Sequence, residues 1–312
     1  MAITVGVDIG GTKVLAVIAE GPKVLKRYGA RVRGRGFEAA IEAVDRLFDG
    51  KIAGDYGVSA IGLGVAGAVD MRTRLVAFSP NLELDGHDVA GAVEERFGLP
   101  VAIDNDANMA AFAEWRFGAG VGASAMLMIT VGTGVGGGVV IDGDIYRGAR
   151  GLAGELGHVI IDESGPLCAC GNHGCLEALA SGTAISRVAR ELMQNRSSII
   201  ARLTGGSDEK VTGEVVADAA EAGDEVAIEA IRRAGHYMGI GLASLAHAFD
   251  PEVIVLGGGV ASGVDGYLDD AAKTFAKMYL VSPDAPRLVK ARLGNDAGVI
   301  GAAALAGRLS GS

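Results

Sequence analysis

The sequence predicts an α/β fold with mixed sheets, built on a duplicated scaffold and divided into two domains. An apolar run at Ala125–Val131 is followed by five glycines within residues 132–138 and then by a second apolar run. A similar unit stands at the N-terminus, where Ile3–Ile9 turns through Gly10–Lys13 into an apolar run at 14–19. The length of 312 residues is ample for two domains with cores of their own.

The rest of the chain continues this alternation of strands and helices. Strands are expected at 24–32, 58–65, 100–103 and 253–256. Helices are expected at 37–48, 89–97, 107–117, from the cap Ser181 to Met193, at 225–249 and at 297–309. We expect the last helix to return to the N-terminal domain. The predicted domains are therefore a small one of residues 1–105 with 295–312, and a large one of residues 106–294, which contains the three cysteines of the chain.

Composition and charge exclude several classes of protein. The formal net charge of −10 argues against a nucleic-acid surface. Asp8 and Lys13 interrupt the N-terminal apolar run, so no signal peptide is expected, and no apolar stretch approaches the length of a membrane span. The first strand begins almost at residue 1, which leaves no room ahead of it for a helix-turn-helix. We expect a cytoplasmic protein that binds neither nucleic acid nor membrane.

Both glycine-rich loops are suited to binding phosphate. Glycine lets main-chain N–H groups approach a ligand closely, and Thr12 and Thr133 add hydroxyl groups. Neither loop has the spacing of a Walker A motif. The GxGxxG pattern occurs at residues 132–137 and 62–67, but β-branched and apolar residues follow each match where a dinucleotide-binding fold would begin a helix. We therefore predict phosphate binding without a dinucleotide.

A histidine and the three cysteines of the chain predict a metal site. Cys168, Cys170 and Cys175 lie within eight residues, and His158 precedes them. Three thiolates and one imidazole make a closed tetrahedral zinc site, and disulfides are rare in cytosolic enzymes. Three small buried thiols are the alternative, but they would not explain the crowding. Spacing alone does not decide between His158 and His173 as the fourth ligand.

Polar residues collect after the strand at 100–103. Residues 104–108 read DNDAN, and one of Asp104, Asn105 and Asp106 is expected to cap the following helix. A carboxylate at a strand end can also accept a proton from a hydroxyl that attacks phosphorus, so Asp106 is the candidate general base. The side-chain types that a polyhydroxyl ligand needs are present at Asn81, Asn105, Asp106, Glu155, His158 and Glu177.

Five motifs together resemble the ROK family, which comprises repressors and sugar kinases. They are DIGGTK at Asp8–Lys13, NDAN at Asn105–Asn108, GTGVGGG at Gly132–Gly138, ELGH at Glu155–His158 and CACGNHGCLE at Cys168–Glu177. The resemblance implies an actin-like (ribonuclease H-like) duplicated α/β fold of two domains with a cleft between them. It also implies an ATP-dependent kinase that phosphorylates glucose at the 6-hydroxyl. Ala66 and His247 depart from the family pattern, which has proline and asparagine at these places.

The resemblance further implies a role for each matching residue. Asp106 matches the general base, and Asp8 would help to hold Mg²⁺. Sugar-binding positions correspond to Gly67, Asn81, Asn105, Asp106, Glu155, His158 and Glu177. Positions that bind ATP correspond to Asp8, Gly10, Gly11, Thr12, Lys13, Thr133, Gly134, Gly258 and Gly259. The ligands of a structural Zn²⁺ correspond to His158, Cys168, Cys170 and Cys175.

Alternatives to a glucokinase remain at this stage. The sugar could be another hexose or an N-acetylhexosamine, and the donor could be polyphosphate in place of ATP. A sugar-sensing repressor is the non-enzymatic alternative, although the sequence offers no DNA-binding segment for it. The family resemblance favours a homodimer or tetramer.

Overall fold

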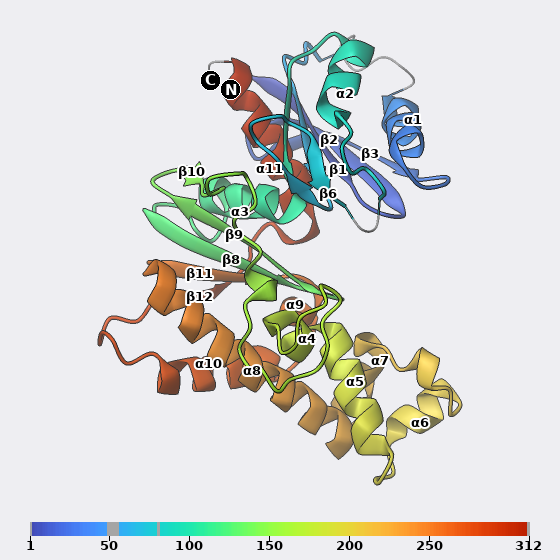
Figure 1. The fold of residues 1–312 in the computed structure, drawn as a ribbon, viewed down its shortest axis with the longest axis vertical. Helices are drawn as coiled ribbons and strands as arrows, with labels where there is room; N and C mark the ends of the chain where they lie inside the picture. Colours follow the sequence, from blue (N-terminus) through green and yellow to red (C-terminus); the bar gives the residue numbers. More distant parts are fainter. Residues whose placement is uncertain (1, 49–55, 80–81, 311–312) are drawn as a thin grey trace. The chain divides into compact units, whose positions relative to one another are not determined.

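The computed structural model describes residues 2–48, 56–79 and 82–310 (Figure 1). Contacts group the chain into two compact units. Unit 1 comprises Met1–Ser124, Gly138–Gly154 and Arg292–Ser312, and unit 2 comprises Ala125–Gly137 and Glu155–Ala291. This grouping places residues 106–124 with the N-terminal strands, whereas the predicted boundary falls at residue 105, because the helix that begins at Asp106 packs against the C-terminal helix of unit 1.

Unit 1 is built on a five-stranded sheet with the order β3-β2-β1-β4-β7. Its strands are β1 (Ile3–Ile9), β2 (Lys13–Glu20), β3 (Lys23–Arg31), β4 (Ile61–Val65) and β7 (Val101–Asn105). The first three form an antiparallel meander, and β4 and β7 extend it in parallel from β1. The carboxyl ends of β1, β4 and β7 therefore meet at one edge of the sheet, and this edge carries Asp8 and Asn105.

The helices of unit 1 are α1 (Phe37–Phe48), α2 (Val89–Phe97), α3 (Asp106–Phe117) and α11 (Ala297–Gly307). The short strands β5 (Ala68–Val69) and β6 (Val76–Phe78) form a separate ladder. Helix α11 lies directly on β1 and β4 (Figure 1). A Cβ atom at Gly6 or Gly62 would stand less than 2 Å from a main-chain oxygen of α11, so these strand glycines permit the close packing.

The second five-stranded sheet has the order β10-β9-β8-β11-β12 and contains the strands of unit 2. Its strands are β8 (Ala125–Val131), β9 (Val135–Ile141), β10 (Asp144–Ile145), β11 (Val253–Gly257) and β12 (Arg287–Lys290), and β9 crosses from unit 2 into unit 1 after Gly137. The helices of unit 2 are α4 (Leu176–Ala180), α5 (Gly182–Met193), α6 (Ile199–Thr204), α7 (Gly213–Glu221), α8 (Glu225–Phe249), α9 (Gly259–Gly263) and α10 (Tyr267–Met278). Helix α8 packs against both α5 and α10 (Figure 1).

The glycine-rich stretch at 132–138 differs from the predicted loop. Strand β9 begins at Val135, so the turn itself is confined to residues 132–134 and three of the five glycines lie in a strand. A Cβ atom at Gly137 would stand 2.8 Å from the side chain of Leu156, and one at Gly138 would stand 2.6 Å from Ala111. These two glycines therefore serve close packing, and the loop predicted to bind phosphate is shorter than expected.

Most long elements agree with the predictions. Helices α1, α2 and α8 and strands β1 and β8 have the predicted bounds, and Ser181 caps α5 by accepting a hydrogen bond from the Ala184 N–H. Helices α6, α7 and α10 were not predicted. Among the described residues, no helix combines the length and the apolar character that crossing a membrane requires.

Candidate functional site

The turn from β7 into α3 holds the predicted general base. Asn105 is the helix cap, because its Oδ1 accepts hydrogen bonds from the N–H groups of Ala107 (2.9 Å) and Asn108 (3.1 Å). Its Nδ2 donates to the Gly67 carbonyl at 3.0 Å, which joins two residues that the sequence assigned to sugar binding. Asp106 is therefore the first residue of the helix, where the helix dipole favours the ionised carboxylate.

Asp104 is a supporting residue that the predicted set did not include. Its carboxylate is almost fully buried and accepts hydrogen bonds from the Asn105 N–H and from Nδ2 of Asn108, both at 2.8 Å. Arg147 completes the group, because its Nε lies 2.6 Å from Oδ2 of Asp104. The ion pair fixes the main chain immediately before Asp106. It joins residues 43 apart in the sequence, so no local pattern reveals it.

Replacing Arg147 with alanine is expected to destabilise the protein by about 3–5 kcal/mol, because the change leaves a buried carboxylate without its partner. Chemical denaturation at neutral pH measures this loss. The exposed Arg150 provides a matched control, and Arg150→Ala should change the free energy of unfolding by less than about 0.5 kcal/mol. Equal effects of the two substitutions would mean that the Asp104–Arg147 pair contributes nothing specific.

Asp8 occupies the end of β1, next to the first glycine-rich turn. The Gly10 N–H donates to the Lys13 carbonyl at 3.0 Å and closes this turn, while residues 11–13 are exposed. The pKa of Asp8 is raised to about 6, chiefly by burial and also by the negative charge of Asp106, while Lys13 opposes both. Two neighbouring carboxylates at one sheet edge repel each other unless a cation lies between them. Carboxylates are ligands that Mg²⁺ prefers.

The raised pKa of Asp8 predicts a pH-dependent cost to folding. The folded state holds this proton more tightly than the unfolded state, so stability falls as the pH rises from about 4 to about 6. Without nucleotide or Mg²⁺, Asp8→Asn is expected to stabilise the protein at pH 7.5 by up to about 3 kcal/mol, and by less than about 1 kcal/mol at pH 4. Thermal unfolding across this range measures the difference, with the exposed Asp284→Asn as control. A difference that does not vary with pH would contradict the assignment.

Unit 2 brings His158 and the three cysteines into one cluster. Their ligand atoms all lie within 4.8 Å of one another. The Sγ atoms of Cys170 and Cys175 are 3.6 Å apart, and Sγ of Cys168 is 3.6 Å from Nδ1 of His158. Zn–S bonds of about 2.3 Å in a tetrahedral site separate the sulfur atoms by about 3.8 Å, which is close to the 3.6 Å between Cys170 and Cys175.

The chemistry of the thiols also fits a cation. Burial raises the pKa of Cys168, and burial together with the neighbouring thiols raises that of Cys175 to about 12. Without a positive charge the two buried thiols stay protonated, and three thiolates at this separation would repel one another. The rival ligand His173 lies outside the cluster, where its Nδ1 stands 3.0 Å from the Gly165 carbonyl oxygen.

Two predicted sugar-binding carboxylates adjoin this cluster. Glu177 has one oxygen 3.7 Å from Sγ of Cys168, and its other oxygen accepts a hydrogen bond from the Val135 N–H at 3.0 Å. A Cβ atom at Gly134 would stand 2.3 Å from that second oxygen, so a side chain there would displace the carboxylate of Glu177. Glu155 lies 4.0 Å from Nε2 of His158. The imidazole therefore presents Nδ1 to the cysteines and Nε2 to the carboxylate.

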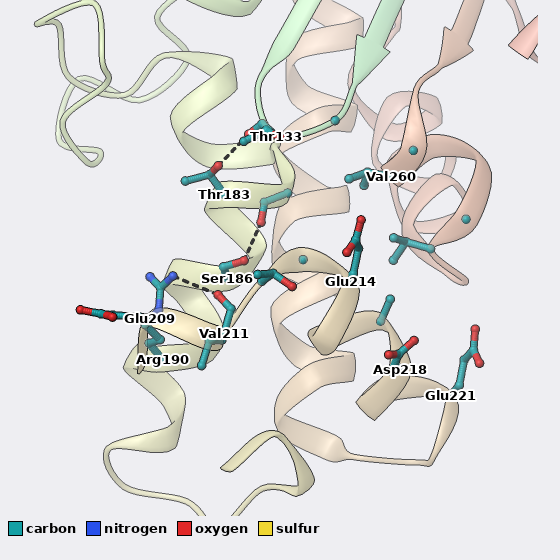
Figure 2. A pocket seen from close by; sticks show the side chains of 18 residues that line it. Thr133, Thr183, Ser186, Arg190, Glu209, Val211, Glu214, Asp218, Glu221 and Val260 are labelled. Carbon is teal, nitrogen blue, oxygen red and sulfur yellow. Dashed lines mark hydrogen bonds between the residues drawn. The ribbon is translucent and has the colours of Figure 1, made fainter. Parts of the chain in front are cut away.

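The turn at 132–134 opens onto a cavity of about 690 Å³ in unit 2 (Figure 2). The first residues of α5 support the turn, because the Gly182 N–H donates to the Gly132 carbonyl and the Thr183 hydroxyl donates to that of Thr133. Gly259 also lines the cavity, and the preceding Gly258 has φ +89°, a conformation that other residues rarely adopt. The remaining lining comes largely from α5, α7 and α9.

The structure thus places the predicted residues in three groups. Asp8, Gly10–Lys13, Gly67, Asn105 and Asp106 lie in unit 1. The metal cluster with Glu155 and Glu177 is one group in unit 2, and the cavity with Thr133 and Gly259 is another. Asn81 lies outside the described residues. The predicted set also lacked Asp104, Arg147 and the acidic residues of α7.

Comparisons with known proteins extend over nearly the whole chain. The ROK family matches residues 4–308. A glucokinase of Streptomyces coelicolor is 37% identical over 98% of each protein. A putative xylose repressor of Caldicellulosiruptor sp. is 32% identical over 98% of this chain and 78% of that protein.

A solved structure gives the same result. It is a ROK family glucokinase from Streptomyces griseus in complex with glucose and AMPPNP. It matches with a TM-score of 0.85 at 37% identity, over 98% of this chain and 100% of that one. The likeness confirms the predicted actin-like α/β fold with two domains.

Proposed function

The chain belongs to the ROK family, and from this premise we propose that it is an ATP-dependent glucokinase that phosphorylates the 6-hydroxyl of glucose. The observation that carries the proposal is the full-length similarity to the Streptomyces griseus enzyme, which was solved with glucose and AMPPNP. The sequence similarity to the Streptomyces coelicolor glucokinase covers 98% of each protein, so this chain is a sugar kinase. The proposal adds that glucose is the substrate, that its 6-hydroxyl is phosphorylated, and that the residues have the roles given below.

Asp106 is the proposed general base. Its carboxylate accepts the proton of the 6-hydroxyl as the oxygen attacks the γ-phosphorus, a role that contributes typically 10²–10⁴-fold to the rate. The local structure supports this role in two ways. Asn105 caps the helix through the N–H groups of both Ala107 and Asn108, while Asp106 shares the first of these, and the buried Asp104–Arg147 pair holds the preceding main chain in place. A base held in one position keeps the reacting atoms aligned.

The two glycine turns are the proposed phosphate-binding elements. Gly10, Gly11, Thr12 and Lys13 form the turn in unit 1, and Thr133 and Gly134 belong to the turn in unit 2. The 690 Å³ cavity beside Thr133 has the size of a small-ligand pocket, and we assign it with Gly258 and Gly259 to the adenosine. Mg²⁺, when bound, neutralises charge on the transferring phosphoryl group. Asp8 is the residue proposed to help hold it.

The sugar-binding role is proposed for Gly67, Asn81 and Asn105 with Asp106, and for Glu155, His158 and Glu177. A zinc ion on His158, Cys168, Cys170 and Cys175 would supply structural cross-linking alone, because all four positions are taken by protein ligands. With Nδ1 of His158 facing the thiols, Nε2 keeps its hydrogen for a partner on the side of Glu155. The ligand cluster therefore orients three side chains that are proposed to contact the sugar.

A coupled assay with ATP and a panel of hexoses and N-acetylhexosamines tests the proposal. The expected result is a kcat/KM for glucose at least about tenfold above that of each other sugar, since one missing or misplaced hydroxyl contact costs that much or more. A kcat/KM that is higher for an N-acetylhexosamine than for glucose would mean that the N-acetylhexosamine is the substrate. No transfer to any sugar of the panel would overturn the assignment.

A further inference from the structure

The cavity beside Thr133 has two chemically different ends (Figure 2). The end formed by Gly132, Thr133 and Gly259 is uncharged and offers main-chain groups and hydroxyls. The other end is formed by α7 and the residues before it. Glu214, Asp218 and Glu221 follow one another at helical spacing, so they share one face of α7, and all three line the cavity.

This second end carries a marked negative charge. Its carboxylates belong to Glu214, Asp218 and Glu221, whereas Glu209 lies beside Arg190 with its carboxylate directed away from them (Figure 2). Among the described residues that line the cavity, Arg190 is the one basic side chain. Its guanidinium already donates to the main-chain carbonyls of Asp208 (3.1 Å) and Val211 (3.0 Å). Three carboxylates therefore line the cavity on the α7 side of the phosphate-binding turn, and the guanidinium of Arg190 is already engaged by main-chain carbonyls.

We propose that this acidic end selects a nucleoside triphosphate and rejects inorganic polyphosphate as the phosphoryl donor, an inference that rests on the proposed kinase function. The two donors offer the same kind of terminal phosphates to the glycine turn, and they differ beyond it. ATP continues as an uncharged nucleoside, whose hydroxyl and amino groups donate hydrogen bonds to carboxylates. Polyphosphate continues with a negative charge on each further phosphate, which the same carboxylates repel.

Competition against ATP tests the inference, because it measures binding even where no phosphoryl group is transferred. The probes are tripolyphosphate, which is no longer than the triphosphate of ATP, and a long-chain polyphosphate, which extends beyond the turn. The variant Glu214→Gln/Asp218→Asn/Glu221→Gln keeps side-chain size and removes three charges. We expect its inhibition constant for the long chain to fall at least about tenfold, and that for tripolyphosphate to change little.

A matched variant controls for net charge. Glu225→Gln/Asp269→Asn/Asp284→Asn removes three exposed carboxylates of unit 2 that do not line the cavity, and it should leave both inhibition constants unchanged. Salt gives a second readout. Because repulsion between exposed charges is screened, the advantage of the cavity variant for the long chain should shrink as ionic strength rises.

The outcomes separate this inference from the proposed function. Wild-type enzyme that phosphorylates glucose with ATP, and with long-chain polyphosphate at a comparable kcat/KM, would overturn donor selection alone. An unchanged inhibition constant for the long chain in the cavity variant would overturn it as well. Failure of the wild type to use ATP with any sugar would instead refute the kinase assignment on which the inference rests.

Discussion

Asp106→Asn is expected to lower kcat by about 10²-fold or more, because the amide cannot accept the proton of the attacking hydroxyl. The side chain keeps its shape and part of its hydrogen bonding. Asn105 continues to cap α3 through Ala107 and Asn108, so the helix is expected to remain intact. Glucose should therefore still bind, and the effect should fall on turnover.

Steady-state kinetics and calorimetry separate these two quantities. Asp88 offers a matched control in the same unit, because its side chain caps α2 by accepting from the Gly91 N–H and asparagine is an equally good cap. Asp88→Asn should leave kcat within about twofold, as expected of a surface change that keeps its cap. Near-normal turnover of Asp106→Asn would reduce Asp106 to the first residue of a helix.

Cys175→Ala is expected to lose the metal and to weaken glucose binding more than ATP binding. Cys175 is fully buried, and its Sγ lies 3.6 Å from that of Cys170, so its loss opens the ligand set. The imidazole of His158 would then lose the bond that fixes its orientation. Glu177, which lies 3.7 Å from Cys168, would lose a fixed neighbour. The glycine turn proposed to bind phosphate adjoins the other oxygen of Glu177, away from Cys168, so ATP should be less affected.

Elemental analysis should find about one zinc per chain in the wild type and none in the variant. Cys170 is exposed, so Cys170→Ala tests the same ligand set if Cys175→Ala fails to fold. His173→Ala is the matched control, because His173 lies outside the cluster and its loss should retain the metal. A folded, zinc-free variant with unchanged glucose affinity would break the link between metal and sugar.

The sequence was most informative where chemistry is local. The crowding of Cys168, Cys170 and Cys175 indicates the residues that the structure gathers, and the strand predicted at 100–103 lies within two residues of the observed β7, which ends at Asn105. The sequence was misleading at Gly136–Gly138, because a glycine that makes room for a neighbouring side chain cannot be told from one that binds phosphate by its sequence position. Only the packing against Leu156 and Ala111 distinguishes the two.

Other features could not be predicted because they depend on distant partners. Arg147 has no motif, and its importance follows from the buried Asp104 on another element. The carboxylates of α7 resemble an ordinary solvated helix face, since three acidic residues at helical spacing are usual there. Their position in the cavity that α5, α7 and α9 form together distinguishes them from such a face.

Identification of the product tests the central claim most directly. The purified protein is incubated with ATP, Mg²⁺ and either glucose or 6-deoxyglucose, and the products are identified by ³¹P NMR. The account predicts glucose 6-phosphate from glucose, and no phosphorylated sugar from 6-deoxyglucose, which lacks the attacking hydroxyl. A sugar phosphorylated at another position, or equal phosphorylation of both substrates, would contradict it.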